Sequence, residues 1–279
     1  MSDALVTTAW LADHLDDPDL RVIDATWYMP NVGRTGRQDY VQRHIPGAVF
    51  WDIDAIADQT SKLPHMLPRA QRFGQLVGQL GIGNDTRVVA YDATGVSSAA
   101  ARAWWMLRAF GHDKVSVLDG GLPKWLAENR PVTDAETALQ PKTFNARFRP
   151  ELVRALEQVR ANIKDGKDQV LDARSAGRFA GTEAEPRPGL RSGHIPGSRN
   201  LPHTELWDPK TKTMLPPAQL ARKFAAAGID TKKPVVTSCG SGVTACVLAL
   251  GLYQLGANAA VYDGSWTEWG GRSDTPIAP

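Results

Sequence analysis

The segment Pro234-Val-Val-Thr-Ser-Cys239-Gly-Ser-Gly-Val-Thr244-Ala-Cys246-Val-Leu-Ala-Leu250 contains a β-branched run, a glycine-containing loop and an apolar run. Val235 to Thr237 favour a short buried strand. The apolar residues from Val243 to Leu255 favour a helix, and Gly256 supplies its stop signal. The segment therefore predicts a strand, a tight loop that opens with Cys239, and a helix.

The position of Cys239 suits a nucleophilic sulfur. A cysteine just before a helix faces unpartnered amide N–H groups and the positive end of the helix dipole, and both stabilise the thiolate over the thiol. Gly240 and Gly242 allow the backbone to turn so that successive amides converge on one anion. The alternative is that Cys239 packs as a small hydrophobic residue, as free cysteines commonly do.

The loop Cys239-Gly-Ser-Gly-Val-Thr244 resembles the active-site loop of the tandem-domain rhodanese-like sulfurtransferases, in the form that acts on 3-mercaptopyruvate. Relatives that prefer thiosulfate carry a basic pair after the cysteine, where this chain has Gly240 and Ser241. Thiosulfate is a compact dianion that favours cations in the loop, whereas mercaptopyruvate has one carboxylate that other residues can bind. The resemblance covers nearly the whole chain, and transfer of sulfur from thiosulfate to cyanide is the alternative activity.

The resemblance implies covalent catalysis in two half-reactions. The Cys239 thiolate takes sulfur from 3-mercaptopyruvate, pyruvate leaves as its enolate, and the resulting persulfide passes its outer sulfur to a thiol or to cyanide. The backbone amides of Gly240, Gly242, Val243 and Thr244 are then expected to hold the negative charge of the persulfide. The family requires no cofactor or metal, and the six histidines show no metal-ligand spacing. A thioredoxin-like dithiol would suit as the sulfur acceptor.

Two arginines are expected to bind the substrate. The stretch from Gly177 to Arg187 resembles the substrate-binding segment of the family, and Arg178 and Arg187 occupy its two arginine positions. Arginine suits this role because its planar fork can bind a carboxylate through two hydrogen bonds. The alternative is that these arginines form surface salt bridges with Glu183 or Glu185.

The resemblance also implies an acid–base relay made of a serine in the loop and a histidine and an aspartate from the first half. The matching residues are Ser241, His65 and Asp54. In this relay His65 would handle a proton for the enolate or keto oxygen. The alternative is that His65 is a structural loop residue. His44 and His194 occur in His-Ile-Pro-Gly in both halves, so a structural role is expected for them.

The second half of the chain repeats the plan of the first. Val170-Leu-Asp172-Ala matches Val22-Ile-Asp24-Ala, and His194-Ile-Pro-Gly197 matches His44-Ile-Pro-Gly47. A repeat of domain size indicates duplication, and strands that alternate with helices indicate a mostly parallel sheet. The fold class is therefore α/β, with two tandem rhodanese-like domains, each a mostly parallel sheet with helices on both faces.

The expected boundaries are 1–130 for the first domain, 131–150 for a proline-containing linker and 151–279 for the second domain. Asp92 stands in the first half where Cys239 stands in the second. A carboxylate cannot accept sulfur and would repel an anionic substrate. The first domain is therefore expected to be catalytically silent.

Local patterns predict the elements of the first half. Thr8 is expected to cap a first helix, Val49 to Ile53 to form one strand, and Arg87 to Tyr91 another. A helix is expected from about Val96 to Phe110.

The composition of the 279-residue chain, 42% apolar and 22% charged, is typical of a globular protein. Met1-Ser-Asp-Ala-Leu5 lacks the pattern of a secretory signal, and no apolar run reaches the roughly 18 residues of a membrane span. A net charge of +2 without a dense basic run argues against nucleic acid as a partner. Cys239 and Cys246 make no disulfide framework, so a reducing compartment, the cytoplasm, is expected, with Cys246 packed in its helix.

Two further alternatives come from other classes of protein. Cysteine phosphatases and arsenate reductases place a cysteine in a similar loop but need an arginine six residues later, where this chain has Ala245. A non-catalytic rhodanese-like module that binds a protein partner would not need Cys239 together with Arg178 and Arg187.

Overall fold

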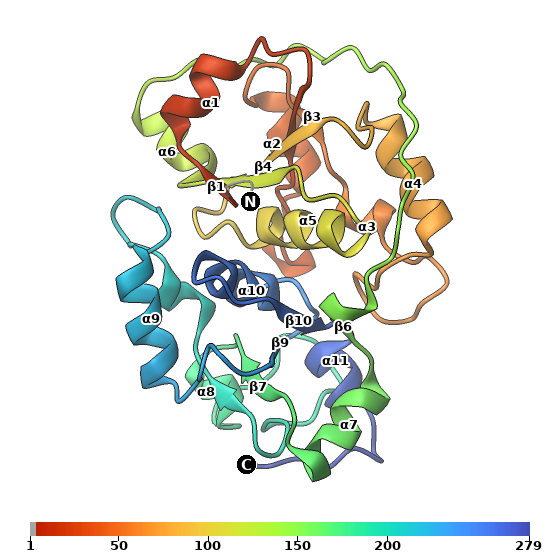
Figure 1. Cartoon of the computed structure of the whole chain (residues 1–279), viewed down its shortest axis with the longest axis vertical. Coiled ribbons are helices and arrows are strands. Elements are labelled where there is room, and N and C mark those ends of the chain that lie inside the picture. Colours follow the sequence, from red (N-terminus) through yellow and green to blue (C-terminus); the bar gives the residue numbers. More distant parts are fainter. Residues whose placement is uncertain (1–3) are drawn as a thin grey trace. The chain divides into compact units, whose positions relative to one another are not determined.

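The computed structural model describes residues 4–279, which form two compact units (Figure 1). One unit comprises residues up to Gln59, Leu67–Arg149 and Asp208–Met214, and the other comprises Thr60–Met66, Pro150–Trp207 and Leu215–Pro279. Residues 1–3, which open the stretch considered for a secretory signal, lie outside the described residues. Within residues 4–279, no helix combines the length and the apolar character that crossing a bilayer requires.

The first unit contains a five-stranded parallel sheet with the strand order β1-β5-β4-β2-β3. Its strands are β1 (Leu5–Val6), β2 (Leu20–Asp24), β3 (Val49–Phe50), β4 (Arg87–Tyr91) and β5 (Val115–Leu118). Its helices are α1 (Thr8–His14), α2 (Gly36–Gln42), α3 (Ile53–Ile56), α4 (Ala70–Gln79), α5 (Ser98–Ala109) and α6 (Gly121–Ala127). Buried Leu11, Leu118 and Trp125 pack α1 and α6 against one face of the sheet, and α5 lies on the other face (Figure 1).

The second unit repeats this sheet with the order β6-β10-β9-β7-β8, again all parallel. Its strands are β6 (Val153–Arg154), β7 (Gln169–Asp172), β8 (Arg199–Asn200), β9 (Val235–Ser238) and β10 (Ala259–Tyr262). Its helices are α7 (Leu156–Asp165), α8 (Ala176–Phe179), α9 (Pro217–Ala226), α10 (Ala245–Gln254) and α11 (Ser265–Trp269). Val159, Val236 and Trp269 join α7 and α11 to one face, and α10 covers the other (Figure 1). The predicted α/β class, with parallel sheets and helices on both faces, is confirmed.

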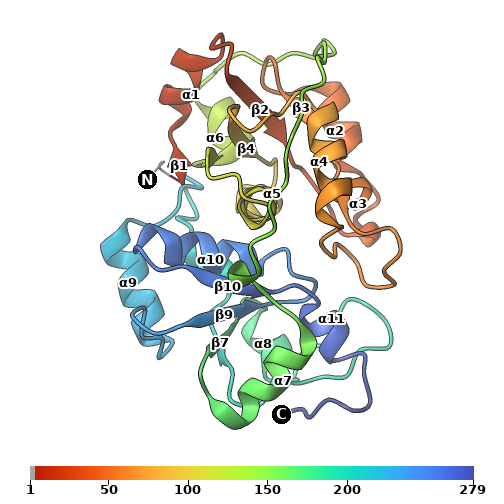
Figure 2. The same ribbon diagram turned by 45° about the vertical axis from the view of Figure 1, so that its right-hand side comes forward.

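Residues 131–149, most of the predicted linker, run as an extended chain along the first unit (Figure 2). The amide of Lys142 donates to the carbonyl of Gly78, and the amide of Arg147 donates to the carbonyl of Phe110, both at 2.9 Å. Phe144 is buried between these two hydrogen bonds. This part of the chain is thus attached to the first unit along its length.

The predicted cap of the first helix is wrong by one residue. Thr7, not Thr8, precedes α1, and its side chain accepts from the amide of Trp10 at 3.1 Å. Thr8 is buried, and its hydroxyl donates to Glu128 at 2.6 Å. Thr7 and Thr8 are equally suitable caps by residue type, so the sequence alone does not choose between them. The hydrogen bond from Thr8 to Glu128, which is distant in the chain, shows that Thr7 is the cap.

The predicted strand from Val49 to Ile53 is too long. The strand β3 ends at Phe50, and Ile53 already belongs to α3. The side chain of Asp52 caps this helix by accepting from the amides of Asp54 and Ala55. Capping by aspartate therefore ends the extended backbone earlier than the apolar pattern indicates. The strand from Arg87 to Tyr91 is confirmed at both ends.

Candidate active site

The strand β9 delivers Cys239 to the centre of the second sheet, because β9 is its middle strand and all its residues are buried. Cys239 follows directly, with 1% of its surface exposed, and α10 begins at Ala245. The predicted strand, loop and helix are therefore confirmed, with α10 shorter than expected by two residues at its start. Ligands of parallel α/β sheets bind at the carboxyl ends of the strands, which is where Cys239 lies.

The loop after Cys239 is anchored through its carbonyl groups. The carbonyl of Cys239 accepts from the amide of Trp266 at 2.9 Å. The carbonyl of Gly240 accepts from both the amide and the hydroxyl of Thr267, at 2.8 and 2.6 Å. The carbonyl of Gly242 accepts from the Cys246 thiol at 3.2 Å. Cys246 is thus buried in α10 with a partner of its own, and both cysteines are free thiols.

The amide groups of the loop are used differently from its carbonyls. Among the hydrogen bonds of residues 4–279, the amides of Gly240, Ser241, Val243 and Thr244 have no protein acceptor. Gly242 has a φ of 77°, a left-handed conformation that glycine adopts without strain. Amides that have no protein acceptor at a helix N-terminus form an anion site. The loop can therefore hold negative charge on a sulfur attached to Cys239.

The structure brings both predicted arginines to this loop. An ideal Cβ atom built on Gly240 would lie 3.0 Å from Nη2 of Arg178 and 4.0 Å from Nη1 of Arg187. Because Gly240 has no side chain, the two guanidinium groups can approach the loop next to Cys239. The arrangement places two cations beside the residue that follows Cys239, where they could bind an anion.

Arg178 also forms an ion pair with Glu185, as the alternative to substrate binding predicts, but this pair is not on the surface. Its Nη2 and Nε donate to the carboxylate of Glu185 at 2.6 and 3.2 Å. The side chain of Glu185 is only 2% exposed and that of Arg178 is 20% exposed. The other candidate, Glu183, accepts from Ser175 at 2.6 Å.

The three residues of the predicted relay lie in three different segments of the chain. Ser241 lies in the cysteine loop and is 7% exposed. His65 is 3% exposed with a φ of 62°, and it belongs to Thr60–Met66, which packs in the second unit. Asp54 lies in α3 of the first unit, where its carboxylate accepts from Nε1 of Trp27 at 2.8 Å. The relay of Asp54, His65 and Ser241 stays a prediction.

His44 and His194 have equivalent contacts in the two units. The His44 ring stacks on Tyr40 at 4.1 Å, and its Nδ1 pairs with the Tyr40 carbonyl at 2.7 Å. The His194 ring stacks on Phe179 at 3.8 Å, and its Nδ1 pairs with the Phe179 carbonyl at 2.9 Å. These shared contacts support a structural role for both histidines.

In the first unit, Asp92 follows β4 as Cys239 follows β9. One carboxylate oxygen accepts from the amide and hydroxyl of Thr94, at 2.9 and 2.6 Å. The other accepts from the amides of Ala99 and Ala100, at 3.0 and 3.1 Å. Asp92 is fully buried, and this burial raises its pKa. The amides at the N-terminus of α5 thus already have the Asp92 side chain as their acceptor. The catalytic silence of the first domain stays a prediction.

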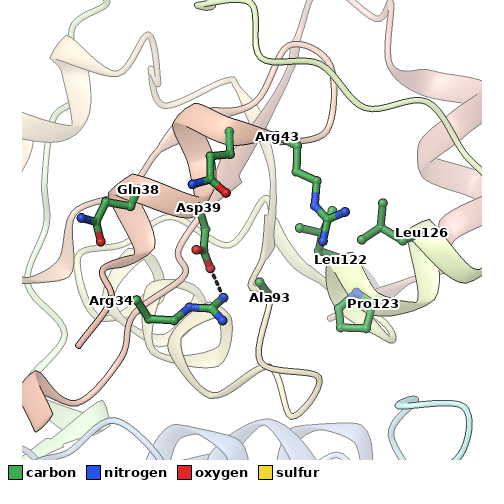
Figure 3. Close-up of a pocket in the computed structure, with 9 residues that line it drawn as sticks. Arg34, Gln38, Asp39, Arg43, Ala93, Leu122, Pro123 and Leu126 are labelled. Carbon is green, nitrogen blue, oxygen red and sulfur yellow. Dashed lines mark hydrogen bonds and ion pairs between the residues drawn. The ribbon is translucent and has the colours of Figure 1, made fainter. Parts of the chain in front are cut away.

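A hollow of about 700 Å³ lies beside Ala93, the residue after Asp92, with α2 and α6 as its walls. Figure 3 shows the guanidinium of Arg34 directed at the carboxylate of Asp39, with which it forms an ion pair. The two side chains are 53% and 23% exposed, so this pair is far more solvated than the one beside Gly240.

The fold and the site together define a tandem-domain α/β enzyme with a buried cysteine in a loop that can bind an anion. The model of the rhodanese-like domain matches residues 7–128 and 155–272. Human 3-mercaptopyruvate sulfurtransferase is 45% identical over 95% of this chain and 91% of its own length. Mouse thiosulfate sulfurtransferase is 44% identical with the same coverage. The crystal structure of an Escherichia coli 3-mercaptopyruvate enzyme with the rhodanese fold superposes with a TM-score of 0.86 at 41% identity, covering 95% of this chain and 99% of that one.

The chain belongs to the rhodanese-like family and is a tandem-domain sulfurtransferase. Enzymes of this kind act on small molecules, and the predicted family, fold and enzyme class are confirmed. The sequence indicates Glu185 only as a surface partner of Arg178, whereas the structure buries its side chain. Arg174, which also contacts Glu185, was not predicted as part of the site. No group of three or more potential metal ligands lies together among residues 4–279.

Proposed function

We propose that this chain transfers sulfur from 3-mercaptopyruvate, through a persulfide on Cys239, to a thiol acceptor. The observation that carries the proposal is the approach of Arg178 and Arg187 to the uncharged loop residue Gly240. A monocarboxylate substrate can place its charge on these arginines while its sulfur meets Cys239. The loop itself then needs no cationic side chain.

In the first half-reaction, the Cys239 thiolate attacks the sulfur of the substrate. A sulfur–sulfur bond forms, the carbon–sulfur bond breaks, and its electron pair leaves on carbon as the enolate of pyruvate, which then takes a proton. The loop amides stabilise the persulfide anion, because they are fixed in place before the charge develops. In the second half-reaction, an acceptor thiolate attacks the outer sulfur, and Cys239 leaves as its thiolate.

We further propose that Ser241, His65 and Asp54 supply and remove protons during the first half-reaction. His65 is a suitable donor to the enolate because an imidazole ring can donate a proton from one nitrogen and accept one at the other. Removal of His65 is then expected to slow persulfide formation and to leave sulfur discharge to cyanide unchanged.

Thiosulfate is the second candidate donor. The mouse relative named for thiosulfate and the human relative named for 3-mercaptopyruvate are almost equally identical to this chain, at 44% and 45%. Overall identity therefore does not choose between the two donors. The uncharged pair Gly240 and Ser241 favours mercaptopyruvate, because a dianion bound in the loop gains more from cations there.

We propose a dithiol protein of the thioredoxin type as the acceptor, since its second thiol can release the sulfur and leave a disulfide. The two buried free thiols of this chain fit a reducing compartment, and the cytoplasm is the location that we propose.

The test is the ratio of kcat/KM for 3-mercaptopyruvate and for thiosulfate with cyanide as acceptor, using Cys239→Ser as the control. The expected result is a strong preference for mercaptopyruvate that disappears in the variant. Intact-protein mass spectrometry after loading should show one added sulfur atom on the wild type and none on Cys239→Ser. Preference for thiosulfate would support the second candidate, and failure to turn over either donor would contradict both.

A further inference from the structure

We propose that Arg174 and Glu185 are positioning residues, which together orient Arg178 toward the substrate at the Cys239 loop. The inference rests on the proposed function, because it concerns how the same site binds its anionic donor. It assigns a role to two buried charges that lie behind the substrate arginine.

Glu185 joins the two arginines. One oxygen of its carboxylate accepts from Nη1 of Arg174 at 2.7 Å and from Nε of Arg178 at 3.2 Å. The other oxygen accepts from Nη2 of Arg178 at 2.6 Å. The side chain of Arg174 is fully buried and that of Glu185 is 2% exposed, so water does not compete for these bonds. Buried charges of this kind require matched partners, and here each charge has them.

The two bonds from Arg178 to Glu185 fix the plane of its guanidinium. They use the edge of the group formed by Nε and Nη2. Within the described chain, Nη1 of Arg178 has no protein acceptor, and Nη2 lies 3.0 Å from the position of a Cβ on Gly240. Glu185 therefore holds the edge formed by Nε and Nη2, and it leaves Nη1 available to a ligand while Nη2 lies next to the loop. A carboxylate can bind Nη1 and Nη2 through two parallel hydrogen bonds.

Arg174 links this arrangement to the cysteine loop. Its Nε and Nη2 donate to the carboxylate of Asp172 at 2.9 and 2.8 Å. Its guanidinium lies over the ring of Trp266, 4.2 Å from the centroid. The amide of Trp266 in turn donates to the carbonyl of Cys239 at 2.9 Å. The backbone of the nucleophile and the substrate arginine are thus held by one connected set of buried groups.

Comparison of the two units separates this role from a general need of the fold. In the first unit, the residue that corresponds to Arg174 is Thr26, in Asp24-Ala-Thr26 against Asp172-Ala-Arg174. The amide and hydroxyl of Thr26 bond to Asp24 at 2.9 and 2.5 Å, so a threonine suffices for the buried aspartate. The arginine occurs in the unit that has the cysteine.

The test is Glu185→Gln, with persulfide formation and persulfide discharge measured separately by rapid mixing. The glutamine side chain has no charge and only one oxygen, so it cannot accept both hydrogen bonds that Arg178 donates to the Glu185 carboxylate. Arg178 should then lose its fixed orientation, and kcat/KM for loading from 3-mercaptopyruvate should fall about tenfold or more. The rate at which cyanide discharges a preloaded persulfide should stay within about twofold of wild type, because this step needs no carboxylate contact. Glu185→Asp should restore part of the loading rate. Glu183→Gln, two residues away and exposed, is the matched control and should load normally.

A second variant tests the inference in case Glu185→Gln does not fold. Arg174→Lys keeps the charge but loses the fork, and it should show the same loading defect with normal discharge. The inference would be overturned if Glu185→Gln loads at the wild-type rate, or if it loses rate equally in both half-reactions. If Glu185→Gln does not fold, the same two outcomes in Arg174→Lys would overturn the inference. Failure of wild-type protein to use 3-mercaptopyruvate would instead contradict the proposed function.

Discussion

The amide of Cys239 donates to the hydroxyl of Ser265 at 3.1 Å. The same hydroxyl donates to the carbonyl of Tyr262 at 2.7 Å, so it connects the start of the cysteine loop to the end of β10. Ser265 is fully buried and has a φ of 49°. A residue in this left-handed conformation at the start of α11 is held there by its surroundings. The position of Cys239 therefore depends on a serine that no sequence motif indicates.

Replacement of Ser265 by alanine tests this dependence. The change leaves the Cys239 amide and the Tyr262 carbonyl buried without this partner, at an expected cost of about 1–3 kcal/mol in the free energy of unfolding. Persulfide formation should also slow, because Cys239 is no longer fixed. Urea unfolding and single-turnover kinetics measure the two effects. Ser198→Ala, which removes a hydroxyl bonded to Ile195 instead, is the control and should keep normal kinetics.

Substitution of Gly240 by alanine tests the approach of the arginines. The new Cβ would stand 3.0 Å from Nη2 of Arg178, so the guanidinium must shift. Gly240 does not have a positive φ, so backbone strain does not confound the result. KM for 3-mercaptopyruvate should rise about fivefold or more while kcat changes little, as expected when ground-state binding is lost. An unchanged KM would show that Arg178 does not bind the substrate from this position.

Asp92→Ala should destabilise the protein without removing activity. The variant loses the acceptor for the amides of Thr94, Ala99 and Ala100, at an expected cost of about 2–4 kcal/mol. Thermal unfolding followed by circular dichroism measures the loss. At temperatures where the variant remains folded, kcat for sulfur transfer should stay within about twofold of wild type, because the proposed chemistry takes place at Cys239 in the other unit. A specific loss of kcat would contradict the silence of the first unit.

Asp24 should make stability depend on pH. Burial raises its pKa to about 6. The native state therefore keeps this proton longer than the unfolded chain, and the stabilisation is present below about pH 4 and lost as the pH rises through 6. The side chain introduced by Asp24→Asn does not ionise, so the variant does not lose this stabilisation. The free energy of unfolding of the variant, relative to that of wild type, should therefore rise by roughly 2–3 kcal/mol between pH 4 and pH 7. Urea unfolding of both proteins across this range is the measurement, and parallel stability curves would refute the expectation.

The catalytic half of the fold could be predicted because its signals are local. The β-branched residues before Cys239 and the apolar run after Thr244 each define one element, and the repeat of Asp24 as Asp172 shows the duplication. The errors arose where two signals compete over few residues. Thr7 and Thr8 are equally good caps, and Asp52 ends a strand that the apolar pattern would continue.

The residues that hold Arg178 could not be predicted in the same way. Arg174 acts through Glu185, 11 residues away in the chain, and through the ring of Trp266. Such contacts depend on packing that no local pattern describes. One signal was available in the sequence: the alignment of the halves pairs Arg174 with Thr26, and a charge that appears in only one copy of a repeat indicates a role that belongs to that copy.

Asp92 and Cys239 occupy equivalent positions before a helix N-terminus, but their side chains differ in chemistry. The N-terminus of a helix in each unit offers amide donors, and in the first unit the Asp92 side chain accepts from two of them. In the second unit the corresponding position holds the sulfur of Cys239, and in the proposed reaction the charge on this sulfur changes during each turnover. Duplication thus produced one copy in which the group at the helix N-terminus stays the same and one in which, by the proposed reaction, it is modified and restored. The loaded and unloaded forms of the enzyme should accordingly differ in the rigidity of the cysteine loop, whereas the matching loop in the first unit should not change.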